Sequence, residues 1–287
     1  MQEIVFQLPH LRLQGLQQGD INKPVILALH GWLDNAASFL PLAAELDLSE
    51  HQLIALDMAG HGHSQHRSAD AHYHLVDWIQ DIHQLIESNN WSRVTLLGHS
   101  LGGIVASLYA SAFADKVSKL ILLESFGAYS KEPQTSPQQL RESVVSRIEI
   151  ESKIAKHPAS LKNAITARKL AGDMSKASAE ILVRRNLLET DNGIEWRTDR
   201  RLRTISSLRM TEPQVEAFMQ AISCPALVIL GDSGFEKLRE LLAQRDHWIA
   251  HLTKGTCVGG HHFHMDHPQL VAKQINDFLQ IENNQLG

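Results

Sequence analysis

The chain has 287 residues, of which 43% are hydrophobic and 21% are charged, and its formal net charge is -5. This composition is typical of a globular protein with one large domain, or one domain with a substantial insertion, and it excludes a disordered or fibrous chain. The weakly negative charge does not favour nucleic acid as a partner. No apolar run is long enough to cross a bilayer.

The N-terminal segment and the cysteines bear on the compartment. The first residues, MQEIVFQLPHLRL, lack the basic start, long apolar run and small-residue cleavage site of a secretory signal. Cys224 and Cys257 are the only cysteines, which does not suggest a disulfide framework and is typical of a reducing environment. We therefore expect a cytoplasmic protein.

Short β-rich runs alternate with segments of helical spacing. The predicted strands are residues 3–8, 11–16, 25–30, 53–57, 94–98, 119–124, 226–231 and 248–252, and the predicted helices cover about 36–46, 72–88, 101–113 and 266–281. Several strands are continuously apolar, as in a sheet covered on both faces, and the helices are long enough for right-handed crossovers. The first two runs, separated only by Pro9 and His10, indicate an antiparallel hairpin at one edge. The pattern predicts an α/β protein with a mostly parallel, doubly wound sheet.

The alternation stops after residue 127 and resumes near residue 225. Residues 128–213 show helical spacing with plausible serine caps, which predicts a helical cap inserted after the sixth strand into a core of residues 1–127 and 214–287. This cap contains 16 Lys or Arg and 11 Asp or Glu, so it carries +5 and the remainder carries -10. These charges fit solvated helix faces, or a basic rim at a site entrance formed by Arg197, Arg200, Arg201 and Arg203.

The segment VTLLGHSLGGIVASLYA contains the most specific motif. Gly98, Ser100 and Gly102 form GxSxG between an apolar strand and an apolar helix, which is the context that a nucleophilic serine needs. Small residues allow a sharp turn that exposes the hydroxyl, and the helix N-terminus favours developing negative charge. The alternative is a glycine-rich turn in which Ser100 only caps the helix.

A second motif, LALHGWLDN, ends a buried strand and begins a loop. Acyl transfer needs two N–H donors for the oxygen of the tetrahedral intermediate, and we assign them to the backbone of Trp32, which follows Gly31, and of Leu101, which follows the serine. We assign His30, Trp32 and His99 to substrate binding. For His30 a hydrogen-bonded structural role is the alternative.

A third motif, GGHHFHMDHP, follows the last predicted strand. Its histidines fall in a turn rather than at helix-face spacing, and no companion cysteine or carboxylate pattern frames them. We therefore expect no metal and no cofactor. One histidine acting as the base for Ser100 fits the pattern better.

The order of HG, GxSxG and a C-terminal GGH resembles the α/β-hydrolase superfamily over most of the chain except residues 128–213. The segment DMAGHGHS, residues 57–64, also looks like the turn that this family carries after the strand following its HG loop. HGWLDN and GGHHFHMD look most like the serine hydrolase-like proteins and their bacterial relatives. The resemblance implies the α/β-hydrolase fold, with a helical cap between its sixth and seventh strands.

The resemblance also implies the base. The family histidine stands seven residues before a proline that opens the last helix, and here Pro268 indicates His261. The runner-up is His262.

The acid of the triad departs from the family pattern. Most relatives place it three residues beyond a glycine after the seventh strand, and counting from Gly231 that position is Gly234. We prefer Glu124, which ends the predicted sixth strand where some dehalogenase-like relatives carry the acid. An unpaired carboxylate at a buried strand end is costly, so Glu124 needs a partner, and His261 is a candidate for it. The alternatives are Asp232 as the acid and Glu124 as a structural residue bonded to loop N–H groups.

These assignments predict a serine hydrolase that cleaves an ester or similar acyl bond of a small molecule through an acyl-enzyme, without a cofactor. A carbon–carbon bond hydrolase, which resembles this chain in its serine nucleophile, remains an alternative. So does a hydrolase-like binding protein without activity. A haloalkane dehalogenase or an epoxide hydrolase is disfavoured, since those relatives carry an aspartate where this chain has Ser100.

Overall fold

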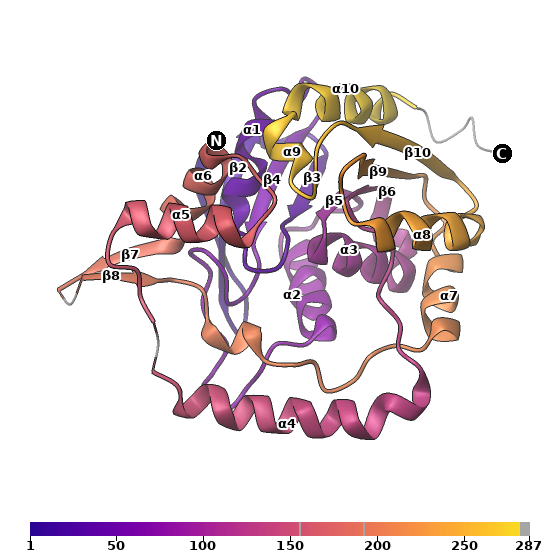
Figure 1. Ribbon diagram of the computed structural model, residues 1–287. Helices are drawn as coiled ribbons and strands as arrows, with labels where there is room; N and C mark the ends of the chain where they lie inside the picture. The colour runs from indigo at the N-terminus through magenta and orange to yellow at the C-terminus, as the bar shows by residue number, and fades with distance from the viewer. Residues whose placement is uncertain (155, 192, 282–287) are drawn as a thin grey trace.

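The computed structural model describes residues 1–154, 156–191 and 193–281 (Figure 1). Its main sheet has the order β1-β2-β4-β3-β5-β6-β9-β10. The strands are β1 (Gln2–Gln7), β2 (Arg12–Gly19), β3 (Val25–Leu29), β4 (Gln52–Asp57), β5 (Val94–His99), β6 (Val117–Leu123), β9 (Ala226–Gly231) and β10 (Leu252–Cys257). The pairs β1–β2 and β2–β4 are antiparallel, and the others are parallel. The mostly parallel sheet and the hairpin at its edge are thereby confirmed.

Helices cover both faces of this sheet. They are α1 (Leu40–Ala43), α2 (Leu75–Ser88), α3 (Leu101–Ala112), α7 (Glu212–Gln220), α8 (Glu236–Arg245), α9 (Phe263–Asp266) and α10 (Pro268–Leu279). Because side chains alternate along a strand, Leu27 and Leu29 pack with α2, α3, α7 and α8, whereas Ile26 and Ala28 pack with α1, α9 and α10. Continuously apolar strands are therefore buried on both faces.

The last strand was placed too early in the sequence prediction. Residues 248–252 were expected to form it, but Asp246–Trp248 form a short 3-10 helix and β10 begins at Leu252. Trp248 and Ile249 are buried at the corner before the strand, which accounts for their apolar character. As an edge strand with several exposed residues, β10 has the sequence LTKGTC, which lacks the long apolar run of a central strand.

Residues 128–213 follow β6, end in the first turn of α7 and contain α4 (Ser136–Ser152), α5 (Leu161–Ala171), α6 (Lys176–Asn186) and η4 (Arg200–Arg203). Figure 1 shows α4 running along one side of the molecule, with α5 and α6 beside the N-terminal strands. A small antiparallel hairpin of β7 (Leu187–Thr190) and β8 (Gly193–Trp196) follows α6 and was not expected. Its side chains are exposed or half-buried, so it lacks the apolar run of a buried strand.

One buried ion-pair network joins α6 to the sheet. Arg185 bonds the carboxylate of Asp57, at the end of β4, with Nε–oxygen distances of 3.1 and 2.9 Å, and it also bonds Glu3 on β1. Asp57 is fully buried and additionally accepts the N–H groups of Ala36 and His63. Arg185 is thus the cationic partner of a carboxylate that water does not reach.

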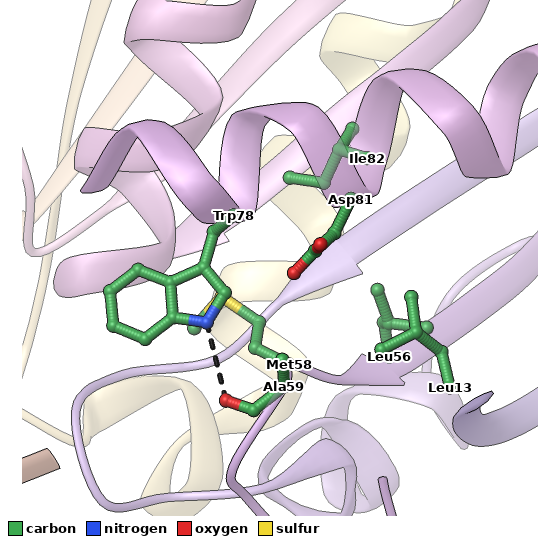
Figure 2. Close-up of a pocket in the computed structure, with 7 residues that line it drawn as sticks. All are labelled: Leu13, Leu56, Met58, Ala59, Trp78, Asp81 and Ile82. Carbon is green, nitrogen blue, oxygen red and sulfur yellow. Dashed lines mark hydrogen bonds between the residues drawn. The ribbon is translucent and has the colours of Figure 1, made fainter. Parts of the chain in front are cut away.

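A second polar anchor lies under α2. Figure 2 shows Trp78, whose indole N–H donates to the Ala59 carbonyl at 3.2 Å, beside the buried Asp81. Asp81 pairs with Arg67 and with His10. These contacts hold the turn after β4 against α2, and none of the residues lining the small pocket in Figure 2 is a candidate site residue.

Both cysteines are free and buried. Among residues 1–154, 156–191 and 193–281, no helix combines the length and the apolar character that crossing a membrane requires.

Replacing Arg185 by alanine is expected to lower the free energy of unfolding by about 3–5 kcal/mol, because it leaves the Asp57 carboxylate buried without its cation. The neighbouring Arg184 is the matched control. It is exposed and, among the described residues, pairs with Glu180 alone, one helical turn away, so Arg184→Ala should change stability by about 0.5 kcal/mol or less. Urea denaturation of both variants measures the difference, and equal effects would contradict the anchoring role of Arg185.

Candidate active site

Ser100 occupies a strained turn between β5 and α3. Its backbone has φ 50 and ψ -116, a conformation that costs a non-glycine residue about 1–3 kcal/mol. The Ser100 N–H continues the sheet ladder to the Leu123 carbonyl on β6 at 3.0 Å. The turn is also tight, because a side chain on Gly98 would overlap the backbone of Gly103. A serine in a strained strand-to-helix turn has the backbone geometry that exposes the hydroxyl of a nucleophilic serine at the end of the sheet.

The loop after β3 lies directly against this turn. A Cβ on Gly102 would overlap the carbonyl of Leu29 and crowd that of His30, so the absence of a side chain lets the first turn of α3 approach the end of β3. The first N–H groups of a helix have no partner within the helix, which leaves the Leu101 N–H available to a ligand. The expected oxyanion donors, Leu101 and Trp32, therefore belong to two segments that pack together.

His30 and His99 are placed differently from the expected substrate-binding role, because both side chains are fully buried. His30 bonds the Gly31 carbonyl through Nδ1 at 2.8 Å and accepts the Met58 N–H at Nε2 at 3.0 Å. His99 donates from Nε2 to the His261 carbonyl at 2.9 Å. Both rings are therefore positioned to hold loops together.

Trp32, in contrast, is 51% exposed. Its indole N–H donates to the Leu202 carbonyl in η4 at 2.9 Å, and the Arg203 guanidinium lies 6.0 Å from its ring centroid. Of the four arginines expected at a basic rim, Arg203 is the one that contacts this tryptophan. The other three, Arg197, Arg200 and Arg201, donate to backbone carbonyls.

His261 lies in the loop between β10 and α9, with its ring centroid 4.2 Å from that of Phe235. Its Nδ1 is buried and has no hydrogen-bond partner among the described residues, and burial lowers the pKa of the ring to about 3. Among the described residues, no hydrogen bond joins the His261 ring to Ser100. A neutral imidazole with an unpaired Nδ1 has the protonation state of a general base and an open position for an orienting acid.

Glu124 is buried at the end of β6 and has a positive φ of 47. Its two carboxylate oxygens accept the N–H groups of Gly231 at 2.8 Å and Phe235 at 2.7 Å. A Cβ on Gly234 would overlap this carboxylate, so Glu124 fills the space next to the position where the family usually carries its acid. Burial raises the pKa of Glu124, although the two N–H donors oppose that change.

Asp232 lies on the exposed side of the same loop. Its Oδ1 accepts the Gly259 N–H at 3.0 Å and the Ser233 hydroxyl at 2.8 Å. The Gly259 N–H lowers the pKa of the Asp232 carboxyl group. The same hydrogen bond positions the start of the loop that carries His261. Neither Glu124 nor Asp232 hydrogen-bonds His261 Nδ1. Phe235 nevertheless links Glu124 to His261, because its backbone N–H donates to Glu124 and its ring packs against the ring of His261.

Asp34 is a buried residue at this site to which the sequence prediction gave no role. Asp34 belongs to the HGWLDN motif, and its place in that motif was the feature of the sequence that could have identified it as a site residue. Its carboxylate pairs with Arg168 through Oδ1 and with His262 Nε2 through Oδ2 at 3.2 Å, and His99 Nδ1 lies 3.7 Å from Oδ2. Burial alone would raise the pKa of Asp34, but His262 and Arg168 hold this pKa well below its usual value.

Residues of the 128–213 segment also touch the histidine loop. Asp173, after α5, accepts the His261 N–H at 3.3 Å and lies so close to Gly260 that a side chain there would overlap it. Asp266, in turn, accepts the N–H of Ser175 at 3.0 Å and the Ser178 hydroxyl at 2.5 Å. The loop that carries His261 and the helix α9 that follows it are therefore both hydrogen-bonded to residues 128–213.

Comparison with known proteins identifies the family of this chain. The sequence profile of the α/β-hydrolase fold family matches residues 24–268. The chain therefore belongs to the α/β-hydrolase fold family, and the predicted fold class is confirmed.

Within this family, serine hydrolase-like proteins are among the similar sequences. That of Danio rerio is 27% identical over 97% of this chain and 88% of its own length, and serine hydrolase-like protein 2 of Homo sapiens is 28% identical over 97% and 94%. The crystal structure of a hypothetical protein from Pseudomonas aeruginosa PAO1 is 35% identical with a TM-score of 0.91, and the match covers 98% of this chain and 100% of that one. The predicted resemblance to serine hydrolase-like proteins and bacterial relatives is thereby confirmed.

Three histidines whose rings are largely shielded from water predict a steep loss of stability in mild acid. Burial lowers the pKa values of His61, His261 and His264 to about 3, whereas an unfolded chain takes up a proton at each near pH 6.5. Their contribution is therefore present above pH 6.5 and is lost as the pH falls. We expect a slope of up to about 4 kcal/mol per pH unit below pH 6. Urea denaturation at pH 7.5, 6.5 and 5.5 measures it, and a flat profile would contradict the burial of neutral rings.

Proposed function

We propose that this protein is a serine hydrolase that cleaves an ester or a similar acyl bond through an acyl-enzyme intermediate. The observation that carries the proposal is the strained Ser100, held at the start of α3 beside the HG loop. Membership of the α/β-hydrolase fold family supports hydrolase chemistry, and the names of the serine hydrolase-like relatives agree with a serine nucleophile.

In the proposed first half-reaction, the neutral His261 takes the proton of Ser100 and the serine oxygen attacks the carbonyl carbon of the substrate. The N–H groups of Trp32 and Leu101 donate to the oxyanion, and the His261 cation then gives its proton to the leaving group. In the second half-reaction, His261 activates a water molecule that hydrolyses the acyl-enzyme. The exposed Trp32 ring and the Phe235 ring are the apolar surfaces proposed to face the substrate.

We assign the acid to Glu124 rather than Asp232. A carboxylate has about four lone-pair positions, and the N–H groups of Gly231 and Phe235 occupy two of those on Glu124. The Glu124 carboxylate therefore has lone pairs left to accept a hydrogen bond from the Nδ1–H of a protonated His261. The Glu124 carboxylate is buried, so its charge is poorly screened, whereas Asp232 is exposed to solvent.

Ser100→Ala should reduce kcat/KM for a short-chain activated ester by about 10⁴-fold or more, because loss of the nucleophile leaves only the contributions of binding and the oxyanion donors. Circular dichroism and thermal unfolding verify that the variant is folded. A parallel assay of the wild type with a vinylogous diketone tests the carbon–carbon hydrolase alternative. Undiminished ester turnover by folded Ser100→Ala would overturn the assignment.

Glu124→Gln and Asp232→Asn separate the two candidate acids. Removing the charge that stabilises the His261 cation should lower kcat by about 10²–10⁴-fold for Glu124→Gln, whereas Asp232→Asn should change it by less than about threefold. Initial rates with the same ester measure both variants, and their melting temperatures control for damage to the loop. The reverse order of effects would assign the acid to Asp232.

A further inference from the structure

A buried group of three ligating side chains lies beside the candidate active site. Asp34 follows β3, His99 ends β5 and His262 follows β10, so the fold assembles them from three distant parts of the sequence. Each side chain is almost fully buried, with residue exposures of 1%, 0% and 5%. One atom from each, namely Asp34 Oδ2, His99 Nδ1 and His262 Nε2, lies within 4.8 Å of the other two.

The tautomer of His99 is fixed by its surroundings. His99 Nε2 lies 2.9 Å from the His261 carbonyl oxygen, which can only accept, so the ring proton is on Nε2. The lone pair of Nδ1 therefore points away from that bond. Within the described part of the chain, this buried atom has no hydrogen-bond partner, and it lies 3.7 Å from Asp34 Oδ2. A lone pair and a carboxylate oxygen facing each other out of water repel, unless a cation lies between them.

The spacing of these atoms fits a metal ion. Zinc binds imidazole nitrogen and carboxylate oxygen at about 2.0–2.2 Å, so two ligands at a tetrahedral angle lie about 3.4 Å apart. The distances from Asp34 Oδ2 to His262 Nε2 and to His99 Nδ1 are 3.2 and 3.7 Å, on either side of that value. The two nitrogens, His99 Nδ1 and His262 Nε2, lie within 4.8 Å of each other.

Space beside the ligands is provided by Gly31. A Cβ there would lie 2.9 Å from both Asp34 Oδ2 and His99 Nδ1, so the missing side chain keeps the region next to both donor atoms open.

Groups outside the three ligands orient them. Arg168 binds Oδ1 of Asp34 and leaves Oδ2 toward the histidines, and the His261 carbonyl holds the ring of His99. Metal-binding histidines commonly donate their second ring N–H to a carbonyl in this way.

We propose that Asp34, His99 and His262 bind a divalent transition-metal ion such as Zn²⁺. Two imidazole nitrogens favour zinc over magnesium or calcium, which prefer oxygen ligands. Bound there, the ion joins the HG loop, the strand that leads into Ser100 and the loop that carries His261. The proposal does not depend on the esterase assignment, because ion binding is measured without substrate.

The test uses the full-length protein without a histidine tag, stripped with a chelator and dialysed. Calorimetric titration with ZnCl₂ should give one site per chain, and Co²⁺ should produce the visible absorption of a low-symmetry site with nitrogen and oxygen ligands. Zinc should also raise the melting temperature, since it binds only the folded chain. Asp34→Asn and His262→Gln should each weaken zinc binding about tenfold or more.

Two further variants make the result specific. Gly31→Ala keeps all three ligands and has no positive φ to disturb, yet its methyl group should abolish binding by filling the space beside the donor atoms. His247→Gln alters an exposed histidine next to Asp246 and should leave zinc binding unchanged. Absence of one stoichiometric site in the wild type, or a site that survives in folded Asp34→Asn, His262→Gln and Gly31→Ala, would overturn the proposal.

Discussion

The strained conformation of Ser100 is the constraint on which the rest of the site depends. A non-glycine residue stays at φ 50 only where the surrounding structure over-determines it. Here the Ser100 N–H extends the sheet ladder to β6, and one strand further the Glu124 N–H extends it in the same way to the Ile229 carbonyl on β9. Glu124 has a similar positive φ. Two adjacent strands are therefore each followed by a residue with positive φ, and they deliver a hydroxyl and a carboxylate to one edge of the sheet.

Close packing at that edge requires residues without side chains. Gly102 admits the end of β3, Gly234 admits the Glu124 carboxylate and Gly260 admits Asp173. Each glycine thus creates a place for a functional or anchoring group from another segment. The chemistry of the site consequently depends on backbone contacts as much as on the reactive side chains.

Much of the fold could be predicted from the sequence because its signals are local. The apolar runs in β3, β5 and β6 identify buried parallel strands, and GHSLG between a strand and a helix identifies the turn at Ser100. Edge strand β10 was placed too early and the β7–β8 hairpin was not predicted, because their residues are largely exposed and carry no apolar run.

The site was harder to predict because its parts interact over long distances in the sequence. The burial of His30 and His99, and the pairing of Asp34 with His262, arise only when β3, β5 and β10 come together. The carboxylate of Glu124 next to Gly234 is a similar case: Glu124 was the preferred acid from the sequence, but only the structure shows its carboxylate filling the space beside the usual acid position. The roles of Ser100, His261 and Glu124 in catalysis remain predictions of this account.

The most direct measurement of the central claim is intact-mass spectrometry after reaction with a fluorophosphonate, followed by peptide mapping. An activated serine should add one phosphonyl group per chain, located on Ser100, and prior heat denaturation should prevent the reaction. An unmodified native chain, or a label on another residue, would contradict the account.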